Sequence, residues 1–423
     1  MELQNDRIIN GLLKADLGFL TPQELSGRLA VDVAIVADPK RAKAEDLWPC
    51  IWFLASVLER QFTGRVVICG LPEALPAPIA LGSRCEFSTD HTAKCAITIF
   101  LGKTPSSDSD ITLEGDARGS ELSYGHPLNG TDHAHPVTCC ALAGYLGFAA
   151  LAHAVGIPPF HEEWRQESLR LPFGGQAVAL PSFSVLGTGQ VGQAFLALAY
   201  FLAAERELTV HLLDKDNFED YNQRTQILLS EHIESWCGQA KVDYLAGICR
   251  TWGWTVSPEQ EEIAWGWRHC PQGQAFAFLG FDNMDARRIA AEGGFSWLFE
   301  CGVGTDFCRP HVTWHSLPSN RELAQELFKE PVRRTNPASA FASALADSPA
   351  DCGRVIFENI EAAAPSLGLV AVAATWTEVM RFIAGDHEPY SGTMFVWSPL
   401  LPPLRESLWQ QQSNPPERKD KGA

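Results

Sequence analysis

The feature that most constrains the fold is a glycine-rich segment in the middle of the chain, residues 183–226. It reads FSVLGTGQVGQAFLALAYFLAAERELTVHLLDKDNFEDYNQRTQ. An apolar run leads into Gly187-x-Gly189-x-x-Gly192, a helical pattern follows, and a second apolar run ends at Asp214, 22 residues after the last glycine. This order of strand, glycine loop, helix and strand predicts a βαβ unit that binds a nucleotide.

The three glycines have separate tasks in such a unit. The first permits a tight turn, the second lets the backbone approach a phosphate, and the third lets the helix pack closely on the strand. The helix N-terminus offers free N–H groups and about half a positive charge to an anion. Asp214 is placed to accept hydrogen bonds from ribose hydroxyls, with a turn or N-cap carboxylate as the alternative. We therefore expect Gly187, Gly189, Gly192 and Asp214 to bind a nucleotide.

The chain also reads as two related halves, each with three apolar, β-branched runs in the same order. These runs end at Asp38, Gly70 and Gly102 in the first half, and at Gly187, Asp214 and Gly280 in the second. Each half then has an apolar segment of 21 residues from proline to glycine, at 136–156 and 365–385. The repetition predicts a duplicated α/β domain, although Ala-rich helices can match by chance.

The first half lacks the glycine loop. At the corresponding place it has Asp38-Pro39-Lys40-Arg41, and proline and long side chains cannot surround a phosphate as glycines do. We expect this half to be a structural or partner-binding copy. The predicted organisation is a first domain at 1–160, a linker at 161–182, an active domain at 183–408 and a flexible tail. The active domain includes a long loop at about 317–352, and the tail is 409–423.

Composition narrows the class of protein. The 51 acidic and 33 basic residues give a net charge of −18, which disfavours nucleic acid and anionic membranes as partners. The longest apolar stretches are interrupted by polar residues, glycine or proline, so a membrane span is not expected. The N-terminus has no secretory pattern, which predicts a cytoplasmic protein. Twelve cysteines without a C-x-x-C pair disfavour a zinc site and a disulfide framework.

Three further motifs follow Asp214 in order. Asn222 and Arg224 come first, Gly238 precedes Lys241 by three residues, and Asp282-Asn283 follows the third apolar run. Together with the glycine loop and Asp214, the series resembles the adenylating-enzyme superfamily that activates ubiquitin and ubiquitin-like sulfur carriers, including the ThiF, MoeB and HesA proteins. The resemblance covers about 183–398. Arg224 stands one residue earlier than the family spacing, which puts its family role in doubt.

The resemblance implies a fold, a nucleotide and a metal. The fold would be a Rossmann-like adenylation domain with a mostly parallel sheet, preceded by a degenerate related α/β domain. The nucleotide would be ATP, and Asn222 would be one of the residues that bind it. Arg224 would act catalytically on the charge that builds on the phosphates, Lys241 would supply a further positive charge to them, and Asp282 would hold Mg²⁺, a metal that prefers oxygen ligands. Surface positions for the two basic residues, and a turn role for Asp282, are the alternatives.

The resemblance also implies a reaction. The C-terminal carboxylate of a ubiquitin-like protein would attack the α-phosphorus of ATP to give an acyl-adenylate, and a cysteine would then capture the acyl group as a thioester. Cys352 is the candidate, because family members place the acceptor in a loop before the helix that matches 365–385, and Arg354 would favour the thiolate. A buried loop cysteine is the alternative, and Cys301 and Cys308 are lesser candidates.

A degenerate copy fused to an active copy resembles the inactive-plus-active arrangement of ubiquitin-type activating enzymes. We place the chain, as a hypothesis, with the activating enzymes of bacterial Bil-type antiviral conjugation systems. The implied partners are a ubiquitin-like substrate and a conjugating enzyme, with an internal pseudo-dimer and homodimerisation left open. Three rivals remain: a sulfur-carrier activator, a nicotinamide-dependent dehydrogenase and a non-catalytic Rossmann scaffold.

Overall fold

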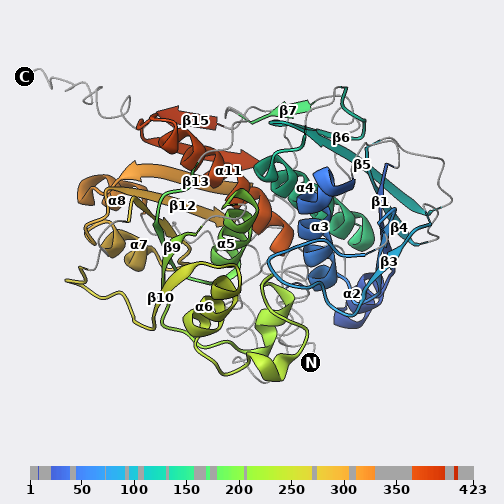
Figure 1. Cartoon of the computed structure of the whole chain (residues 1–423), viewed down its shortest axis with the longest axis horizontal. Coiled ribbons are helices and arrows are strands. Elements are labelled where there is room, and N and C mark those ends of the chain that lie inside the picture. Colours follow the sequence, from blue (N-terminus) through green and yellow to red (C-terminus); the bar gives the residue numbers. More distant parts are fainter. Residues whose placement is uncertain are drawn as a thin grey trace, which may run out of the picture.

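The chain forms a mixed α/β structure with two mostly parallel sheets, one in each half (Figure 1). The computed structural model describes residues 8, 21–38, 44–71, 73–90, 95–102, 109–129, 133–156, 168–171, 179–203, 207–268, 274–303, 311–328, 364–395 and 404–407. Every structural statement below concerns these residues.

The first half contains a seven-stranded sheet in the order β3-β2-β1-β4-β5-β6-β7. Strands β1 to β5 are parallel, and β6 and β7 are antiparallel additions at one edge. Its elements are α2 (Pro22–Leu29), β1 (Val33–Ala37), η2 (Ala44–Leu47), α3 (Trp48–Gln61), β2 (Val66–Cys69), β3 (Cys85–Ser88), β4 (Ile97–Leu101), β5 (Ile111–Arg118), β6 (Glu121–Tyr124), α4 (Pro136–Val155) and β7 (Ser168–Arg170).

The second half contains an eight-stranded sheet in the order β10-β9-β8-β11-β12-β13-β14-β15. Strands β8 to β12 are parallel and the last three are antiparallel. Its elements are β8 (Phe183–Leu186), α5 (Gln190–Ala203), β9 (Thr209–Leu213), η4 (Asp220–Arg224), η5 (Ile233–Ser235), α6 (Lys241–Thr251), β10 (Thr255–Glu259), β11 (Phe276–Leu279), α7 (Met284–Ala290), β12 (Trp297–Val303), β13 (His311–Pro318), α8 (Arg321–Leu327), α11 (Pro365–Ile383), β14 (Tyr390–Phe395) and β15 (Leu404–Ser407).

The two sheets share one strand order. When the strands of each half are numbered from 1 in chain order, both sheets have the order 3-2-1-4-5-6-7. The second sheet adds an eighth strand after the seventh. The three apolar runs predicted in each half are confirmed as strands, β1, β2 and β4 in one and β8, β9 and β11 in the other. Both long apolar segments are helices, α4 and α11. The predicted fold class, a Rossmann-like domain preceded by a related α/β domain, is therefore confirmed.

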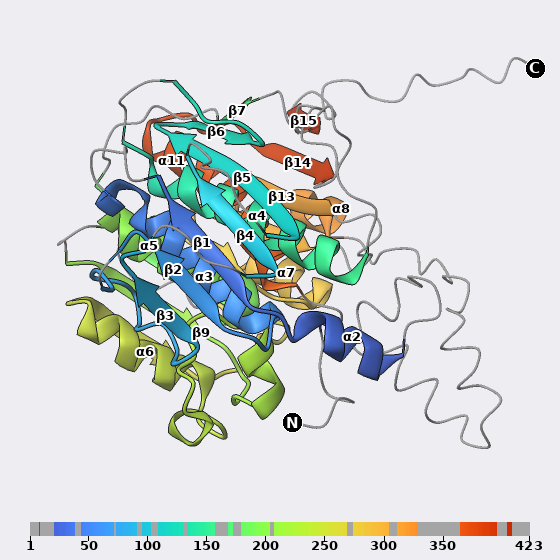
Figure 2. The ribbon, with the colours of Figure 1, turned by 90° about the vertical axis from the view of Figure 1, so that its right-hand side faces the viewer.

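Four helices fill the space between the sheets: α3 and α4 from the first half and α5 and α11 from the second (Figure 1). In Figure 2 the first sheet faces the viewer with α3 and α4 behind it. The ring of Phe201 on α5 lies 5.5 Å from that of Phe53 on α3. A Cβ on Gly144 of α4 would lie 2.7 Å from the carbonyl oxygen of Ser366 on α11, so these two backbones are in close contact. One continuous apolar core therefore joins the halves.

The helices α4 and α11 are both long and apolar enough to cross a membrane by length and composition. Within their most apolar windows, 89% and 78% of the residues are buried inside the protein. They are apolar on nearly all sides because each lies between a sheet and other helices, as core helices do.

The structure adds detail to two predicted segments, 161–182 and 317–352, in the second of which we expect a short helix. The segment 161–182, predicted as a linker, contains β7, which pairs with β6 and so extends the first sheet. A strand of three residues is too short to show a periodic pattern. The predicted loop at 317–352 begins with the end of β13 and with α8, and its part from 329 onward lies outside the described residues, as does the tail at 409–423.

Candidate nucleotide site

The glycine loop joins the end of β8 to the start of α5 and is held by close backbone contacts. Gly187 has a φ of +91°, in the left-handed region that favours glycine. A Cβ on Gly192 would lie 2.3 Å from the carbonyl oxygen of Gly187, so the first turn of α5 rests directly on the loop. A Cβ on Gly189 would meet no atom within 4 Å. The open space at Gly189 is what close approach of a phosphate requires.

A fourth glycine, absent from our sequence prediction of the site, supports the loop from the neighbouring strand. Gly280 directly follows β11, and a Cβ there would lie 2.4 Å from the Gly187 carbonyl oxygen. The contact is reciprocal, because a Cβ on Gly187 would lie 2.7 Å from the carbonyl carbon of Gly280. The sequence shows this glycine as the end of an apolar run, which indicates a turn but not its neighbour.

Asp214 lies at the end of β9 and holds the glycine loop in place. Its Oδ2 accepts hydrogen bonds from the backbone N–H of Thr188 at 2.7 Å and from the Thr188 hydroxyl at 3.0 Å. Its Oδ1 accepts from the N–H of Asp216 at 3.0 Å. Asp214 is 7% exposed as a whole residue. These bonds fit the turn carboxylate raised as the alternative by the sequence, and the predicted contact of Asp214 with ribose hydroxyls stays a prediction.

Asn222 and Arg224 belong to the 3-10 helix η4. The Asn222 side chain accepts a hydrogen bond from the N–H of Glu219 at 2.8 Å, which stabilises the start of η4. Arg224 is buried and donates from Nη2 to the carbonyl of Gln61, at the end of α3 in the first half, at 3.3 Å. The structure therefore places Arg224 at the junction of the halves. Its expected role at the phosphates stays a prediction.

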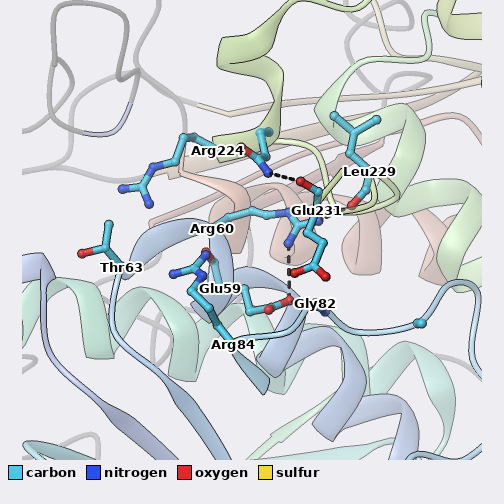
Figure 3. Close-up of a pocket in the computed structure, with 10 residues that line it drawn as sticks. Glu59, Arg60, Thr63, Gly82, Arg84, Arg224, Leu229 and Glu231 are labelled. Carbon is cyan, nitrogen blue, oxygen red and sulfur yellow. Dashed lines mark hydrogen bonds and ion pairs between the residues drawn. The ribbon is translucent and has the colours of Figure 1, made fainter. Parts of the chain in front are cut away.

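A cavity of about 320 Å³ lies at that junction (Figure 3). Three arginines line it, with carboxylates and carbonyl groups around them. The lining residues are Glu59, Arg60, Thr63, Ala80, Gly82, Arg84, Gln223, Arg224, Leu229 and Glu231. The lining thus comes from both halves of the chain.

Lys241 begins α6, three residues after Gly238. Its Nζ lies 3.2 Å from Oδ2 of Asp216, and the Lys241 side chain is 11% exposed against 53% for its partner. The backbone N–H of Lys241 also donates to the carbonyl of Asp216 at 3.0 Å. Because Asp216 follows Asp214 by two residues, these bonds tie the start of α6 to the end of β9. An exposed surface lysine, the alternative raised by the sequence, does not fit this burial.

Asp282 is exposed two residues beyond Gly280, past the end of β11. Lys215 follows Asp214 and donates a hydrogen bond to Glu262, which is the main cause of its raised pKa. The charge of Asp282 contributes least among the groups that raise the pKa of Lys215. Within the described residues, no group of three or more His, Cys, Asp or Glu side chains could hold a metal by itself.

A buried ion pair holds the backbone just before Asp282. Arg287 donates from Nε to the Phe281 carbonyl at 2.8 Å, and its Nη1 lies 2.5 Å from Glu300, whose side chain is fully buried. The other Glu300 oxygen lies 3.7 Å from Nε2 of His315. Burial lowers the pKa of His315 and outweighs the opposite effect of Glu300, so the imidazole is neutral at neutral pH. Arg287 thus neutralises Glu300 and fixes the turn that presents Asp282.

The start of α11 lies beside the glycine loop. Gln190, the first residue of α5, donates from Nε2 to the carbonyl of Ala364 at 2.9 Å. Cys352 lies outside the described residues, 12 residues before Ala364. Its role as the acceptor therefore stays a prediction from the sequence.

Cys301, a lesser candidate for the acceptor, does not fit that role. It lies on β12 and is 1% exposed. Burial raises the pKa of its thiol far above the usual value, with the Glu300 charge acting in the same direction. A thiol without access or thiolate character is a poor nucleophile. Cys308, the other lesser candidate, lies outside the described residues.

A pair of glutamines, also absent from our sequence prediction, connects the glycine loop to the segment after η4. Gln193 on α5 donates from Nε2 to the side chain of Gln226 and to the Thr188 carbonyl. Its Oε1 accepts from the N–H of Leu228 at 2.9 Å. Both glutamine side chains are buried. The sequence does not single them out, because a glutamine in or after a helix that follows a glycine loop belongs to no distinctive motif.

Comparison with known families points to one domain. Residues 180–386 match the family model of the BilD C-terminal domain. The match covers just under half of the chain, from before β8 to the end of α11, and includes every predicted nucleotide-binding residue. The second half is therefore similar to that domain. A search of curated proteins found no match.

Solved structures of E. coli MccB show a weaker likeness. MccB alone is 15% identical, with 54% of this chain and 62% of that chain covered and a TM-score of 0.36. The complex with ATP is 14% identical, with 55% of this chain and 65% of that chain covered and a TM-score of 0.34. The complex with MccA-N7isoASN is 14% identical, with 51% of this chain and 61% of that chain covered and a TM-score of 0.35. The matches span less than two-thirds of the MccB chains, and at these TM-scores they carry no argument about activity.

Proposed function

We propose that this chain is an ATP-dependent enzyme that adenylates the C-terminal carboxylate of a ubiquitin-like protein. One observation carries the proposal: the glycine loop, Asp214 and Asp282 follow three adjacent parallel strands, β8, β9 and β11, at the same edge of the sheet. After β8 the chain adds β9 and β10 on one side of that strand and then β11 on its other side. Ligands of open α/β sheets bind beyond the carboxyl ends of the strands where the order reverses in this way. The match to the BilD C-terminal domain supports placement in a Bil-type system.

The residues at this edge suit a nucleoside triphosphate. Gly189 leaves room for a phosphate at the N-terminus of α5, where the helix dipole and free N–H groups favour negative charge. Asp214 lies beside the loop as an acceptor for ribose hydroxyls. Lys241 brings a positive charge held by Asp216, and an approaching phosphate can compete for it.

Asp282 is the residue proposed to hold Mg²⁺. Magnesium is commonly bound through one or two carboxylates together with substrate phosphates and water, so a single exposed carboxylate at this edge fits the donor set. When bound, the metal would neutralise charge on the phosphates. The Arg287–Glu300 pair keeps the turn before Asp282 in place without using the Asp282 carboxylate itself.

The proposed first step needs positioning and charge neutralisation. A carboxylate oxygen of the ubiquitin-like protein forms a bond to the α-phosphorus while the bond from that phosphorus to the bridging oxygen of pyrophosphate breaks. Pyrophosphate leaves with the electron pair, and the acyl-adenylate remains. Fixed positive groups at the loop can lower the barrier without a covalent bond to the protein.

The proposed second step uses Cys352. Its thiolate attacks the acyl carbonyl, the bond to AMP breaks, and AMP leaves as the thioester forms. The acyl group can then pass to a thiol of a conjugating enzyme. The first half, which has the same strand order without a glycine loop, would act as the inactive member of an internal pseudo-dimer.

The direct test combines the purified chain, ATP, Mg²⁺ and candidate ubiquitin-like proteins, including any found to be encoded by neighbouring genes. We expect intact-mass measurements to show AMP on the carrier, and a carrier adduct on the enzyme that thiol reagents remove. When a sulfur donor such as sulfide is added, a carrier whose acyl-adenylate loses AMP and gains a terminal thiocarboxylate, with no adduct on the enzyme, would favour the sulfur-carrier alternative. Absence of both products with every carrier would reject the proposed function.

A further inference from the structure

The C-terminus of α3, in the first half, is enclosed by the segment 222–231 of the second half. Arg60, on the last turn of α3, donates from Nε to the Gln226 carbonyl at 3.1 Å and from Nη2 to the Leu229 carbonyl at 2.6 Å. The residue is 9% exposed. One guanidinium of the first half thus binds two backbone carbonyls of the second half, in the segment that directly follows Asn222 and Arg224.

The same segment is bonded to the nucleotide loop. Gln193 accepts from the N–H of Leu228 and donates to the Gln226 side chain and to the Thr188 carbonyl. Thr188 in turn donates twice to Asp214. Hydrogen bonds therefore run without a break from the segment that Arg60 holds to the loop and carboxylate proposed to bind the nucleotide.

The cavity beside Arg60 could instead be read as an anion site, because Arg84 and Arg224 also line it (Figure 3). The contacts argue against a ligand. Arg84 donates to the carbonyls of Glu59 and of the C-cap residue Phe62, and Arg224 donates to that of Gln61, so both satisfy carbonyls at the C-terminal end of α3.

Two carboxylates that line the same cavity also argue against an anion site. Glu59 lies 3.5 Å from Nη1 of Arg60, and Glu231 accepts from the N–H of Ser83 at 2.7 Å. With two carboxylates and a helix C-terminus nearby, the three guanidinium charges are largely balanced. The arrangement is a polar connection between the halves.

Arginine is suited to this position for a geometric reason. Its planar fork presents several N–H groups in fixed directions and can bind two carbonyls at once, whereas a lysine presents one compact ammonium. Removing the fork would leave the Gln226 and Leu229 carbonyls without these donors in a buried setting, which is costly.

We propose that Arg60 of the degenerate half is a positioning residue for the nucleotide loop of the active half. It orders the Gln226–Leu229 segment, and Gln193 transmits that order to Thr188 and Asp214. The proposal rests on the proposed function for its catalytic meaning. It also gives the half without a glycine loop a defined task in the reaction.

The test compares Arg60→Ala and Arg60→Lys with Arg65→Ala. Arg65 is a matched control, because it lies in the same half and its exposed side chain pairs with Asp32 and Glu86. In the protein without nucleotide, Arg60→Ala should speed hydrogen exchange of the Leu228 and Thr188 amides by roughly tenfold. Arg60→Lys should give an intermediate effect, and Arg65→Ala should give none.

Nucleotide affinity provides the second readout. Arg60→Ala should raise the KM for ATP in pyrophosphate exchange by roughly tenfold, with a smaller fall in kcat. The effects of Arg60→Ala and Gln193→Ala on that KM should be non-additive, whereas those of Arg65→Ala and Gln193→Ala should add.

The hydrogen-exchange measurement also separates this inference from the proposed function. Unchanged hydrogen exchange of the Leu228 and Thr188 amides in a folded Arg60→Ala variant would overturn the positioning role, whatever the nucleotide data show. Additive effects of Arg60→Ala and Gln193→Ala would also overturn it. Failure of the unaltered chain to bind ATP would reject the proposed function, and faster exchange at the two amides would still support the connection from Arg60 to the loop.

Discussion

Gly280 and Gly187 are in backbone contact: a Cβ on Gly280 would lie 2.4 Å from the carbonyl oxygen of Gly187. Contacts under 3.0 Å are essentially never seen for real Cβ atoms, so a side chain at 280 must displace the loop. The glycine loop is therefore shaped by two strands, β8 and β11, and not by its own three glycines alone. The carboxyl ends of those strands are where the proposed ligand would bind.

Gly280→Ala tests this relationship. We expect the substitution to lower the free energy of unfolding by about 1–3 kcal/mol through overpacking, and to weaken ATP binding measured by titration calorimetry. Gly247→Ala is the control, because Gly247 is exposed on α6 and a Cβ there would meet nothing within 4 Å. That change should stabilise the protein by about 0.5–1 kcal/mol and leave ATP affinity unchanged. Unaltered ATP affinity in Gly280→Ala would contradict this account of the loop.

Lys241→Ala tests the proposed phosphate contact. The side chain is largely buried beside Asp216, so its loss should raise the KM for ATP by roughly tenfold or more in pyrophosphate exchange. Lys215→Ala is the matched control, because Lys215 is 53% exposed and pairs with Glu262. Exposed pairs contribute little, so this control should keep the KM near that of the unaltered chain. Equal effects of the two substitutions would assign Lys241 a general electrostatic role.

Cys352→Ala tests the thioester step separately from adenylation. We expect the reducible adduct between enzyme and carrier to disappear while pyrophosphate exchange continues, because the thiol acts after the acyl-adenylate forms. Cys237→Ala controls for adventitious thiol chemistry, since Cys237 is an exposed cysteine in the described part of the chain. It should leave the adduct intact. Persistence of the adduct in Cys352→Ala would move the acceptor role to another cysteine.

Glu378 on α11 gives a prediction about pH. Burial raises its pKa from 4.5 to about 7, and the charge of Arg381 opposes this shift. The folded state therefore binds more protons than the unfolded state between these values, so this group's stabilising contribution is complete below pH 4.5 and is lost as the pH rises through 7. Glu378→Gln should remove that loss, which is on the order of 1–3 kcal/mol.

Urea denaturation at pH 5 and pH 8 measures the effect. Relative to the unaltered chain, Glu378→Gln should gain stability at the higher pH. If the free energy of unfolding changed by the same amount between pH 5 and pH 8 in the two proteins, Glu378 would titrate as an ordinary carboxyl group and the prediction would be wrong.

The sequence predicted the parts of the fold that depend on local pattern. Runs of β-branched residues ending in Gly or Asp located β1, β2, β4, β8, β9 and β11, and the proline-to-glycine segments located α4 and α11. Edge strands such as β7 were not predicted, because three residues carry no period and their pairing depends on a partner distant in sequence.

In the candidate site, too, the sequence predicted residues of a local motif but not residues whose roles depend on distant contacts. The roles of Gly187 and Gly192 follow from a motif that spans six residues. Those of Gly280, Gln193 and Arg60 depend on contacts between segments far apart in the chain, which a single sequence does not display. Arg224 was singled out by spacing, and the structure places it against Gln61 of the other half. Its spacing departs from that of the family, and its role at the phosphates stays a prediction.

The central claim is that the second half catalyses adenylation of a carrier carboxylate. The most direct measurement is the exchange of labelled pyrophosphate into ATP, with and without candidate ubiquitin-like carriers. We predict exchange that requires the carrier with its C-terminal residue intact, and that falls sharply in Asp282→Asn. Carrier-independent exchange, or no exchange with any such carrier while the protein is folded, would contradict the account.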